Sequence, residues 1–213
     1  MGEAVTLADA EAWVRGFADR VTAERDHLTE LDSAIGDADH GANMARGMSA
    51  VVAALDGSQP DIGALLKKVG MTLVSTVGGA SGPLYGTFFL RVGTAAGGDE
   101  ELDATALAAA VRAGLDGVVA RGKAERGDKT MVDALGPAVD ALDEALAAGS
   151  PLPAALDAAV DAARSGRDAT EPLVARKGRA SYLGQRSAGH VDPGATSVTL
   201  LVESLASAVG GDG

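Results

Sequence analysis

Apolar residues recur at the three- and four-residue spacing of an α-helix through most of this 213-residue chain. Such spacing places apolar side chains on one face, which each helix buries against its neighbours. Alanine is abundant and aromatic residues make up only 3% of the chain, so helices packed through small side chains are favoured over sheets. We therefore expect one all-α domain over residues 1–213, an eight-helix antiparallel up-down barrel or bundle.

The connections between the expected helices alternate in character. The helices are expected at about residues 7–27, 40–56, 61–77, 83–96, 103–121, 130–148, 152–167 and 194–209, with an extra turn near 170–175. Three connections have the sequences DGSQPD, GGDEELD and AGSPLP, and are read as ordinary polar turns. The other four, at residues 31–41, 77–83, 121–130 and 175–196, hold nearly all of the Gly, Asp, Arg and His clusters. In an up-down bundle these four loops share one end, where four helix N-termini offer free N–H groups to an anionic phosphate.

The first of these loops carries three carboxylates, Asp32, Asp37 and Asp39, within the stretch LTELDSAIGDADHGANMARG. Three carboxylates in so short a loop repel one another by roughly 3 kcal/mol per pair at about 5 Å and an effective dielectric near 20, unless a cation lies between them. A hard divalent ion such as Mg²⁺ fits, since it accepts a few carboxylates together with substrate phosphates. The alternative is an acidic, solvated helix-capping loop.

Two further motifs favour a nucleotide, each with a plainer alternative. Backbone amides and the Ser81 hydroxyl of GGASGP could cradle a phosphate, or the motif is an N-capped turn with Pro83 at the first helical position. Met131 of GDKTM could form the floor under a purine, although methionine at such a position is commonly core.

The stretch from residue 177 to 194 is too polar for a core element and too long for a simple turn, which is typical of a lid or binding loop. Within it, Arg179 is best placed to neutralise phosphate charge through its forked donors. For Asp192, Pro193 and Gly194, a helix-start turn and a ligand contact are equally consistent with the sequence. The same end of the bundle should hold Asn43, either exposed or against a nucleotide.

Composition excludes several classes of function. A formal net charge of −12 argues against a nucleic-acid partner. The chain has no cysteine, no apolar run long enough to cross a membrane and no signal-like N-terminus, so we expect a cytoplasmic protein without membrane contact. No Ser/His/Asp arrangement or cysteine nucleophile is apparent, so covalent catalysis is not expected.

Taken together, LTELDSAIGDADHGANMARG, GGASGPLYGTFFLR, GDKTMVDAL and ARKGRASYLGQRSAGHVDPGATS resemble the L-subunit family of bacterial dihydroxyacetone kinase, in order from about residue 5 to 207. The resemblance implies an eight-helix barrel with ADP or ATP and two Mg²⁺ ions at one rim. It implies Mg²⁺ ligation by Asp32, Asp37 and Asp39, and catalytic roles for Arg179 and His40. The nucleotide contacts that it implies are His40, Gly41, Ala42, Asn43, Ala80, Ser81, Gly122, Met131, Arg179, Asp192, Pro193 and Gly194.

The resemblance also implies a phosphotransferase that works with partners. In that family the ketose is held on a separate K subunit, and a phosphohistidine M subunit of the phosphotransferase system rephosphorylates bound ADP. A free-standing chain of this length favours that arrangement over the ATP-dependent one, in which the domain is usually fused behind a K domain. The chain does not reveal the ketose, and a homodimer is left open.

Two other classes of function stay under consideration. One is a nucleotide-loaded subunit that controls a transcription regulator, alone or beside catalysis. The other is an unrelated helical metal-dependent phosphohydrolase that uses the same aspartates.

Overall fold

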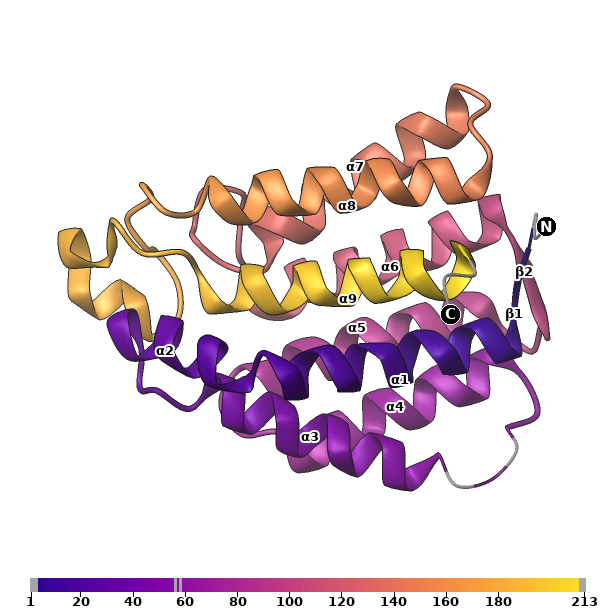
Figure 1. Cartoon of the computed structure of the whole chain (residues 1–213), viewed down its shortest axis with the longest axis horizontal. Helices are drawn as coiled ribbons and strands as arrows, with labels where there is room; N and C mark the ends of the chain where they lie inside the picture. The colour runs from indigo at the N-terminus through magenta and orange to yellow at the C-terminus, as the bar shows by residue number, and fades with distance from the viewer. Residues whose placement is uncertain (1–3, 56, 58, 211–213) are drawn as a thin grey trace.

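The structure, a computed structural model, describes residues 4–55, 57 and 59–210, and most of these residues are helical (Figure 1). The all-α class expected from the sequence is confirmed. The helices are α1 (Leu7–Ala23), α2 (Arg25–Ile35), α3 (His40–Ala54), α4 (Ile62–Thr76), α5 (Ser81–Ala96), α6 (Ala104–Gly122), α7 (Val132–Ala147), α8 (Leu152–Asp168), the 3₁₀-helix η1 (Arg179–Ser187) and α9 (Pro193–Gly210). Two short strands, β1 (Ala4–Thr6) and β2 (Glu101–Asp103), complete the described elements.

The first expected helix is two helices in the structure. α1 ends at Ala23, and α2 follows after Glu24, whose N–H still donates to the Arg20 carbonyl. The prediction that Asp32 lies in a loop was wrong, because α2 continues to Ile35. Leu28, Asp32 and Ile35 form its buried face at helical spacing, a pattern that the density of charge in this stretch obscured.

Long helices pack as neighbours in an order that returns to its start. Proceeding from α1, contacts run through α3, α4, α5, α6, α7, α8 and α9, and α9 packs against α1 again. Apolar side chains from all of these helices form one buried cluster. Trp13 and Phe17 of α1 meet the rings of Tyr85, Phe88 and Phe89 of α5 within it, at centroid distances between 5.6 and 6.4 Å.

Close approach of α4 and α5 depends on glycine. A β-carbon added at Gly70 would lie 2.7 Å from the Gly86 carbonyl oxygen, and one added at Gly86 would lie 2.4 Å from a methyl group of Val74. The two helices therefore touch backbone to backbone, which fixes α5, whose first turn faces the site described below.

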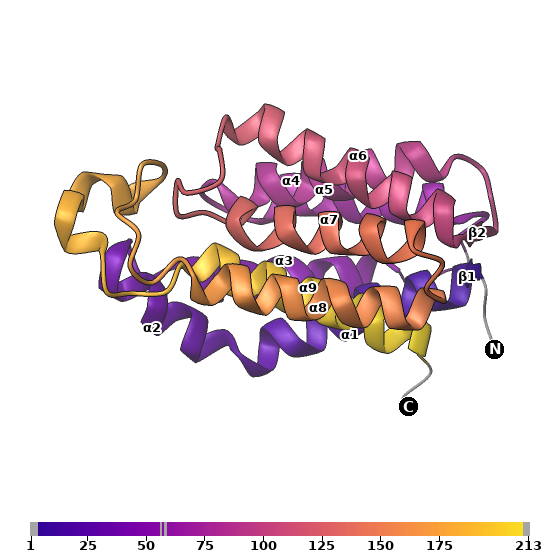
Figure 2. The same cartoon turned by 90° about the horizontal axis from the view of Figure 1, so that it is seen from above.

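The two ends of the molecule differ. β1 pairs antiparallel with β2, and the buried Val5 and Leu102 face each other across the pair. The expectation that GGDEELD is a plain turn was therefore wrong, because its last three residues form β2. A strand of three residues is too short to show the alternation of apolar and polar residues by which strands are predicted. Of the DGSQPD connection, Asp56 and Ser58 lie outside the described residues. The strands and the last turn of α9 lie opposite α2 and η1 (Figures 1 and 2).

The expected loop over residues 177–194 contains η1, which packs against α2. Figure 2 shows it beyond the ends of α8 and α9. The expected extra turn near 170–175 is a hydrogen-bonded turn directly after α8. None of the described helices combines the length and hydropathy that a membrane crossing requires.

Candidate functional site

A cavity of about 460 Å³ opens at the end of the molecule that carries α2 and η1. All four of the charged, glycine-rich loops contribute to its lining, so their convergence, which their alternation along the chain predicts, is observed. Among the expected site residues, those that line it are Asp32, Asp37, Asp39, His40, Ala80, Ser81, Gly122, Met131, Arg179, Asp192, Pro193 and Gly194. The first turns of α3, α5 and α9 face this space, so their unpaired N–H groups favour an anion there.

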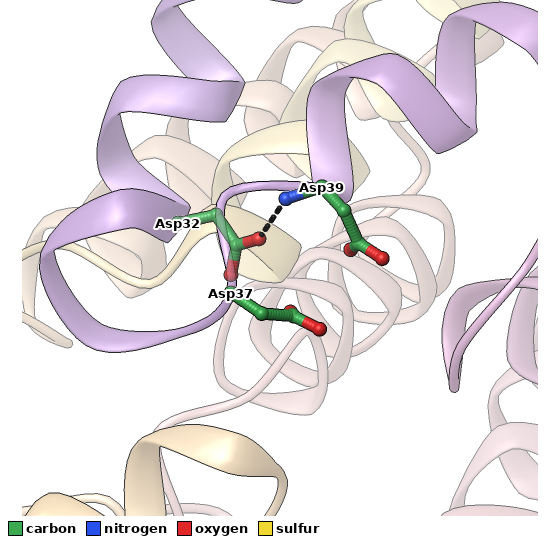
Figure 3. Close-up of side chains that lie close together, drawn as sticks. All are labelled: Asp32, Asp37 and Asp39. Carbon is green, nitrogen blue, oxygen red and sulfur yellow. Dashed lines mark hydrogen bonds between the residues drawn. The ribbon is translucent and has the colours of Figure 1, made fainter.

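Three carboxyl groups gather where α2 ends and α3 begins (Figure 3). Asp32, Asp37 and Asp39 each offer an oxygen within 4.8 Å of the others. Asp32 is buried, and its Oδ2 accepts the backbone N–H groups of Asp39 at 2.8 Å and His40 at 3.1 Å. Ala38 lies between the two exposed aspartates in the left-handed region, with φ of 60°, a strained conformation that is typical of functional turns.

This donor set fits a hard cation. All three groups of the cluster are carboxylates, without the histidine or cysteine that softer metals select. Because Asp32 is oriented by two backbone donors, one of its oxygens is held in a fixed direction before any ion binds. The chemistry of the cluster therefore suits Mg²⁺, while the hydrogen bonds from the start of α3 to Asp32 also agree with the helix-capping loop considered from the sequence.

Arg179 reaches this cluster from η1. Its Nε lies 2.7 Å from Oδ2 of Asp37, although the two residues come from distant parts of the chain. The Arg179 side chain is 69% exposed and that of Asp37 is 34% exposed, so the contact lies at the mouth of the cavity. A guanidinium in this place can donate to further oxygens of an anionic ligand.

His40 lies under the cavity as part of a hydrogen-bonded chain. Its Nδ1 is 3.1 Å from Ser81 Oγ, and its Nε2 is 2.9 Å from Ser197 Oγ, which in turn is 2.7 Å from the Tyr85 hydroxyl. Burial lowers the pKa of His40, although the charges of Asp32 and Asp39 oppose the shift. These hydrogen bonds of the imidazole join α3, α5 and α9. Ser197 and Tyr85 were not predicted, because each lies within an apolar helical stripe.

Asp192 combines the two alternatives that its sequence allows. Its Oδ2 accepts the N–H of Ala195 at 2.7 Å, as a helix-start residue does, and it also lines the cavity. Burial raises the pKa of Asp192 to about 7, and the charge of Asp133 adds to this, while hydrogen bonds from Ala195 and Gly194 and the charge of Lys129 oppose it. Met131 likewise is both buried and part of the lining.

Three expected contacts lie outside the cavity lining: Gly41, Ala42 and Asn43. Gly41 packs α3 against α2, since a β-carbon there would be 2.0 Å from the Arg25 carbonyl oxygen. Asn43 accepts a hydrogen bond from Arg46 at 2.7 Å. Nucleotide contact by these three residues stays a prediction.

The start of α5 differs from the expectation. The helix begins at Ser81 rather than Pro83, with Ala80 as its N-cap. Pro83 is accommodated in the first turn, where its missing N–H leaves no helical carbonyl without a partner. Ser81 is therefore the first helical residue, with its hydroxyl beside His40.

Comparison with known proteins places this geometry in a family. The DAK2 domain matches residues 34–207. The PEP-dependent dihydroxyacetone kinase, ADP-binding subunit DhaL, of Escherichia coli is 50% identical over 91% of this chain and 93% of its own length. The corresponding subunit of the PTS-dependent kinase of Lactococcus lactis is 43% identical over 94% of this chain and 97% of its own.

Among solved structures, the dihydroxyacetone kinase of C. freundii in complex with AMP-PNP and Mg²⁺ matches with a TM-score of 0.68 and 28% identity. The match covers 91% of this chain and 32% of that one, so the chain corresponds to about a third of the longer kinase. The shared fold, together with relatives of this identity over nearly their whole length, shows that the chain belongs to the DAK2 domain family, among the DhaL-type subunits.

Proposed function

We propose that this chain is the nucleotide-binding subunit of a PEP-dependent dihydroxyacetone kinase. The observation that carries the proposal is the cluster of Asp32, Asp37 and Asp39 at the rim of a cavity that helix N-termini face. The clustered carboxylates repel one another unless a cation lies between them, and the neighbouring N–H groups attract an anion. A phosphate ligand that carries a metal ion satisfies both requirements, whereas a metal ion or a phosphate alone satisfies one. Identity of 50% to the E. coli subunit supports the same assignment.

The three aspartates would hold two Mg²⁺ ions, which when bound offset negative charge on the nucleotide phosphates. The backbone N–H groups of Gly41, Ala42, Ala80 and Ser81, with the Ser81 hydroxyl, would bind those phosphates, since the N–H groups of His40 and Asn43 are already donated to Asp32 and Asp39. Gly122, Met131 and the turn from Asp192 to Gly194 would enclose the rest of the nucleotide. These positions lie on four separate loops, so the ligand would tie the loops together.

Arg179 is the residue that we assign to charge stabilisation during phosphoryl transfer. Its guanidinium would donate to the migrating group as that group passes to dihydroxyacetone on a separate K subunit. For His40 we propose orientation rather than proton transfer, since both ring nitrogens already have hydroxyl partners. In that role it directs the Ser81 hydroxyl towards the phosphates.

For the phosphoryl source we propose a phosphohistidine M subunit that recharges ADP in place. Relatives named as PEP- or PTS-dependent subunits are 43–50% identical and similar in length. The L-erythrulose kinase of Pectobacterium atrosepticum is 34% identical, and the chain covers only 33% of it. An ATP-dependent ketose kinase that exchanges its nucleotide is the alternative that the experiment must separate.

The test is reconstitution. The purified chain should retain ADP through gel filtration and appear in native mass spectrometry as protein with ADP and two Mg²⁺ ions. Mixed with a K subunit, dihydroxyacetone and an M subunit charged from phosphoenolpyruvate, it should produce triose phosphate. Rapid multiple turnover with ATP and the K subunit alone would favour the ATP-dependent alternative. Release of phosphate from ATP by the chain alone would contradict the subunit assignment.

A further inference from the structure

Lys129 is a fully buried cation that the proposed reaction does not use. Its side chain is 1% exposed, and its ammonium group is surrounded by backbone carbonyl oxygens. Nζ donates at 2.5 Å to the carbonyl of His190, at 2.9 Å to that of Thr170, at 3.1 Å to that of Leu173 and at 3.3 Å to that of Glu171. Among the described residues no carboxylate lies within ion-pair distance of it.

This environment resembles a binding site for a monovalent cation in which the Lys129 ammonium group takes the place of the ion. Rings of backbone carbonyls are the ligands that proteins offer to bare monovalent cations. Here four carbonyl oxygens share three N–H donors, so only the protonated amine comes close to satisfying all of them. Burial lowers the pKa of Lys129, while the charges of Asp192 and Glu171 oppose that shift.

The four carbonyls belong to the two ends of one loop. We name residues 170–190 the lid segment; it contains η1 and Arg179. Thr170, Glu171 and Leu173 are on its outgoing end and His190 is on its returning end, and the Gly189 N–H also donates to the Glu171 carbonyl at 2.8 Å. The two ends of the loop are therefore held together at its base.

The backbone of the α6–α7 connection is adapted to this contact. Lys129 has φ of 63°, in the left-handed region that a residue with a side chain adopts at a cost of about 1 kcal/mol or more. Its neighbour Asp128 accepts the N–H of Arg176 through its carbonyl at 3.0 Å, which anchors the outgoing end a second time. Residues 128–129 thus reach the lid segment from a different loop of the same cavity.

Within the lid segment, further hydrogen bonds connect its base to η1, where Arg179 lies. Buried Ser187 accepts the Ala175 N–H at 2.9 Å and donates to the Gly184 carbonyl at 2.6 Å, which braces both sides of η1. Arg179 begins η1 and lies against Asp37. The position of its guanidinium therefore depends on where the base of the lid segment is held.

We propose that Lys129 is a positioning residue: its ammonium group joins the two ends of the lid segment and so holds Arg179 over the carboxylate cluster. The inference rests on the proposed function only for its effect on phosphoryl transfer. Its effect on the lid segment itself is independent of any nucleotide or partner subunit.

The first experiment measures the lid segment alone. Lys129→Met keeps an unbranched side chain only one atom shorter and removes its charge and donors. Trypsin should then cleave after the exposed Arg176 and Arg186 faster than in the wild type, while circular dichroism shows the helices intact. The matched control is Lys123→Met, because Lys123 lies in the same connection, also has positive φ (51°), and is exposed. Cleavage of the control should match that of the wild type.

The second experiment restores the cation. Lys129→Ala removes the fragment that n-propylammonium replaces, and this ion should slow tryptic cleavage of the variant again. Tetramethylammonium has the same charge without N–H donors and should not do so. Should the alanine variant fail to fold, the methionine variant decides the matter. Equal cleavage of the wild type and Lys129→Met would overturn the proposal.

The third experiment tests action through Arg179. In the reconstituted kinase, Lys129→Met should lower kcat about 10-fold to 100-fold, as displaced catalytic groups do. The double variant with Arg179→Ala should be no slower than Arg179→Ala alone, within about twofold. Multiplicative losses would show that Lys129 acts elsewhere and would overturn the proposal. If the kinase function itself were wrong, the wild type would make no triose phosphate while the cleavage difference persisted.

Discussion

Arg179 and Asp37 form an ion pair across the mouth of the cavity, with Nε 2.7 Å from Oδ2. Both side chains are partly in water, and pairs of this kind contribute about 0–1 kcal/mol to stability. Either partner of this ion pair can therefore be replaced by another charged group at little cost in free energy. A divalent ion among the three aspartates would compete with Arg179 for Asp37 and leave the guanidinium available to a phosphate.

Replacing Asp37 with Asn should abolish Mg²⁺-dependent ADP binding while leaving helix content unchanged. The substitution removes one of three clustered charges, and Asp37 lies between α2 and α3 rather than in the core. Calorimetric titration with ADP and circular dichroism measure the two effects. Asp19→Asn, an exposed change on α1, serves as the control and should bind ADP like the wild type. If the Asp37 variant bound ADP with undiminished affinity, the proposal that Asp37 binds Mg²⁺ would be wrong.

Arg179→Ala should slow phosphoryl transfer in the reconstituted kinase by about 100-fold, on the order of 3 kcal/mol of transition-state stabilisation. The thermal midpoint should hardly change, because the lost ion pair is exposed. Arg186→Ala on the same 3₁₀-helix is the matched control and should keep normal turnover. Wild-type turnover of the Arg179 variant at saturating partner concentrations would make this arginine a surface charge only.

Asp192 should make the protein less stable as pH rises. Its folded pKa of about 7 lies above the reference value of 3.8, so between these values the folded protein keeps a proton that the unfolded chain has lost. Stability from this group is present below about pH 4 and is lost progressively up to about pH 7, by on the order of 4 kcal/mol.

Asp192→Asn removes this titration and keeps an oxygen to accept the Ala195 N–H. Urea unfolding at about pH 5 and pH 8 should therefore show a smaller loss of stability for the variant than for the wild type. The same pH dependence in both proteins would contradict the raised pKa.

Gly70→Ala should lower the free energy of unfolding by about 1–3 kcal/mol through overpacking. The new β-carbon would press on the Gly86 carbonyl and on Leu90, so α4 and α5 must separate. Alanine's better helix propensity, about 1 kcal/mol, recovers only part of this loss. Gly98→Ala, at an exposed position with open space around it, is the control for urea titrations. If the Gly70 variant were as stable as the wild type, α4 and α5 would be able to separate without loss of stability, and the prediction would be wrong.

The sequence predicts the helices well because their stabilising contacts are periodic. Val69 and Leu73 of α4, for example, are buried at helical spacing. It also locates Asp37 and Asp39, since acidic residues next to glycine are visible locally. Asp32 was placed in a loop because its helical context, Leu28 and Ile35, is outweighed by nearby charge.

What the sequence does not predict depends on contacts between distant segments. Ser197 meets His40 and Tyr85 through contacts between residues far apart in the chain, and nothing around Ser197 in the sequence marks it. The carbonyl cage of Lys129 is made of backbone atoms, which leave no trace in residue identity. The short β1–β2 pair is likewise a long-range contact between segments too brief to show alternation.

The opposed placement of β1 and the end of α9 relative to the cavity has a consequence for protein architecture. The first described residues, in β1, and the last, at the end of α9, lie at the end of the helices away from the cavity, so an extension at either point would begin far from the rim (Figure 1). The same unit can therefore be joined to other domains without obstruction of its chemistry. Two erythrulose kinases to which the chain is similar are longer proteins, of which it covers 33% and 36%.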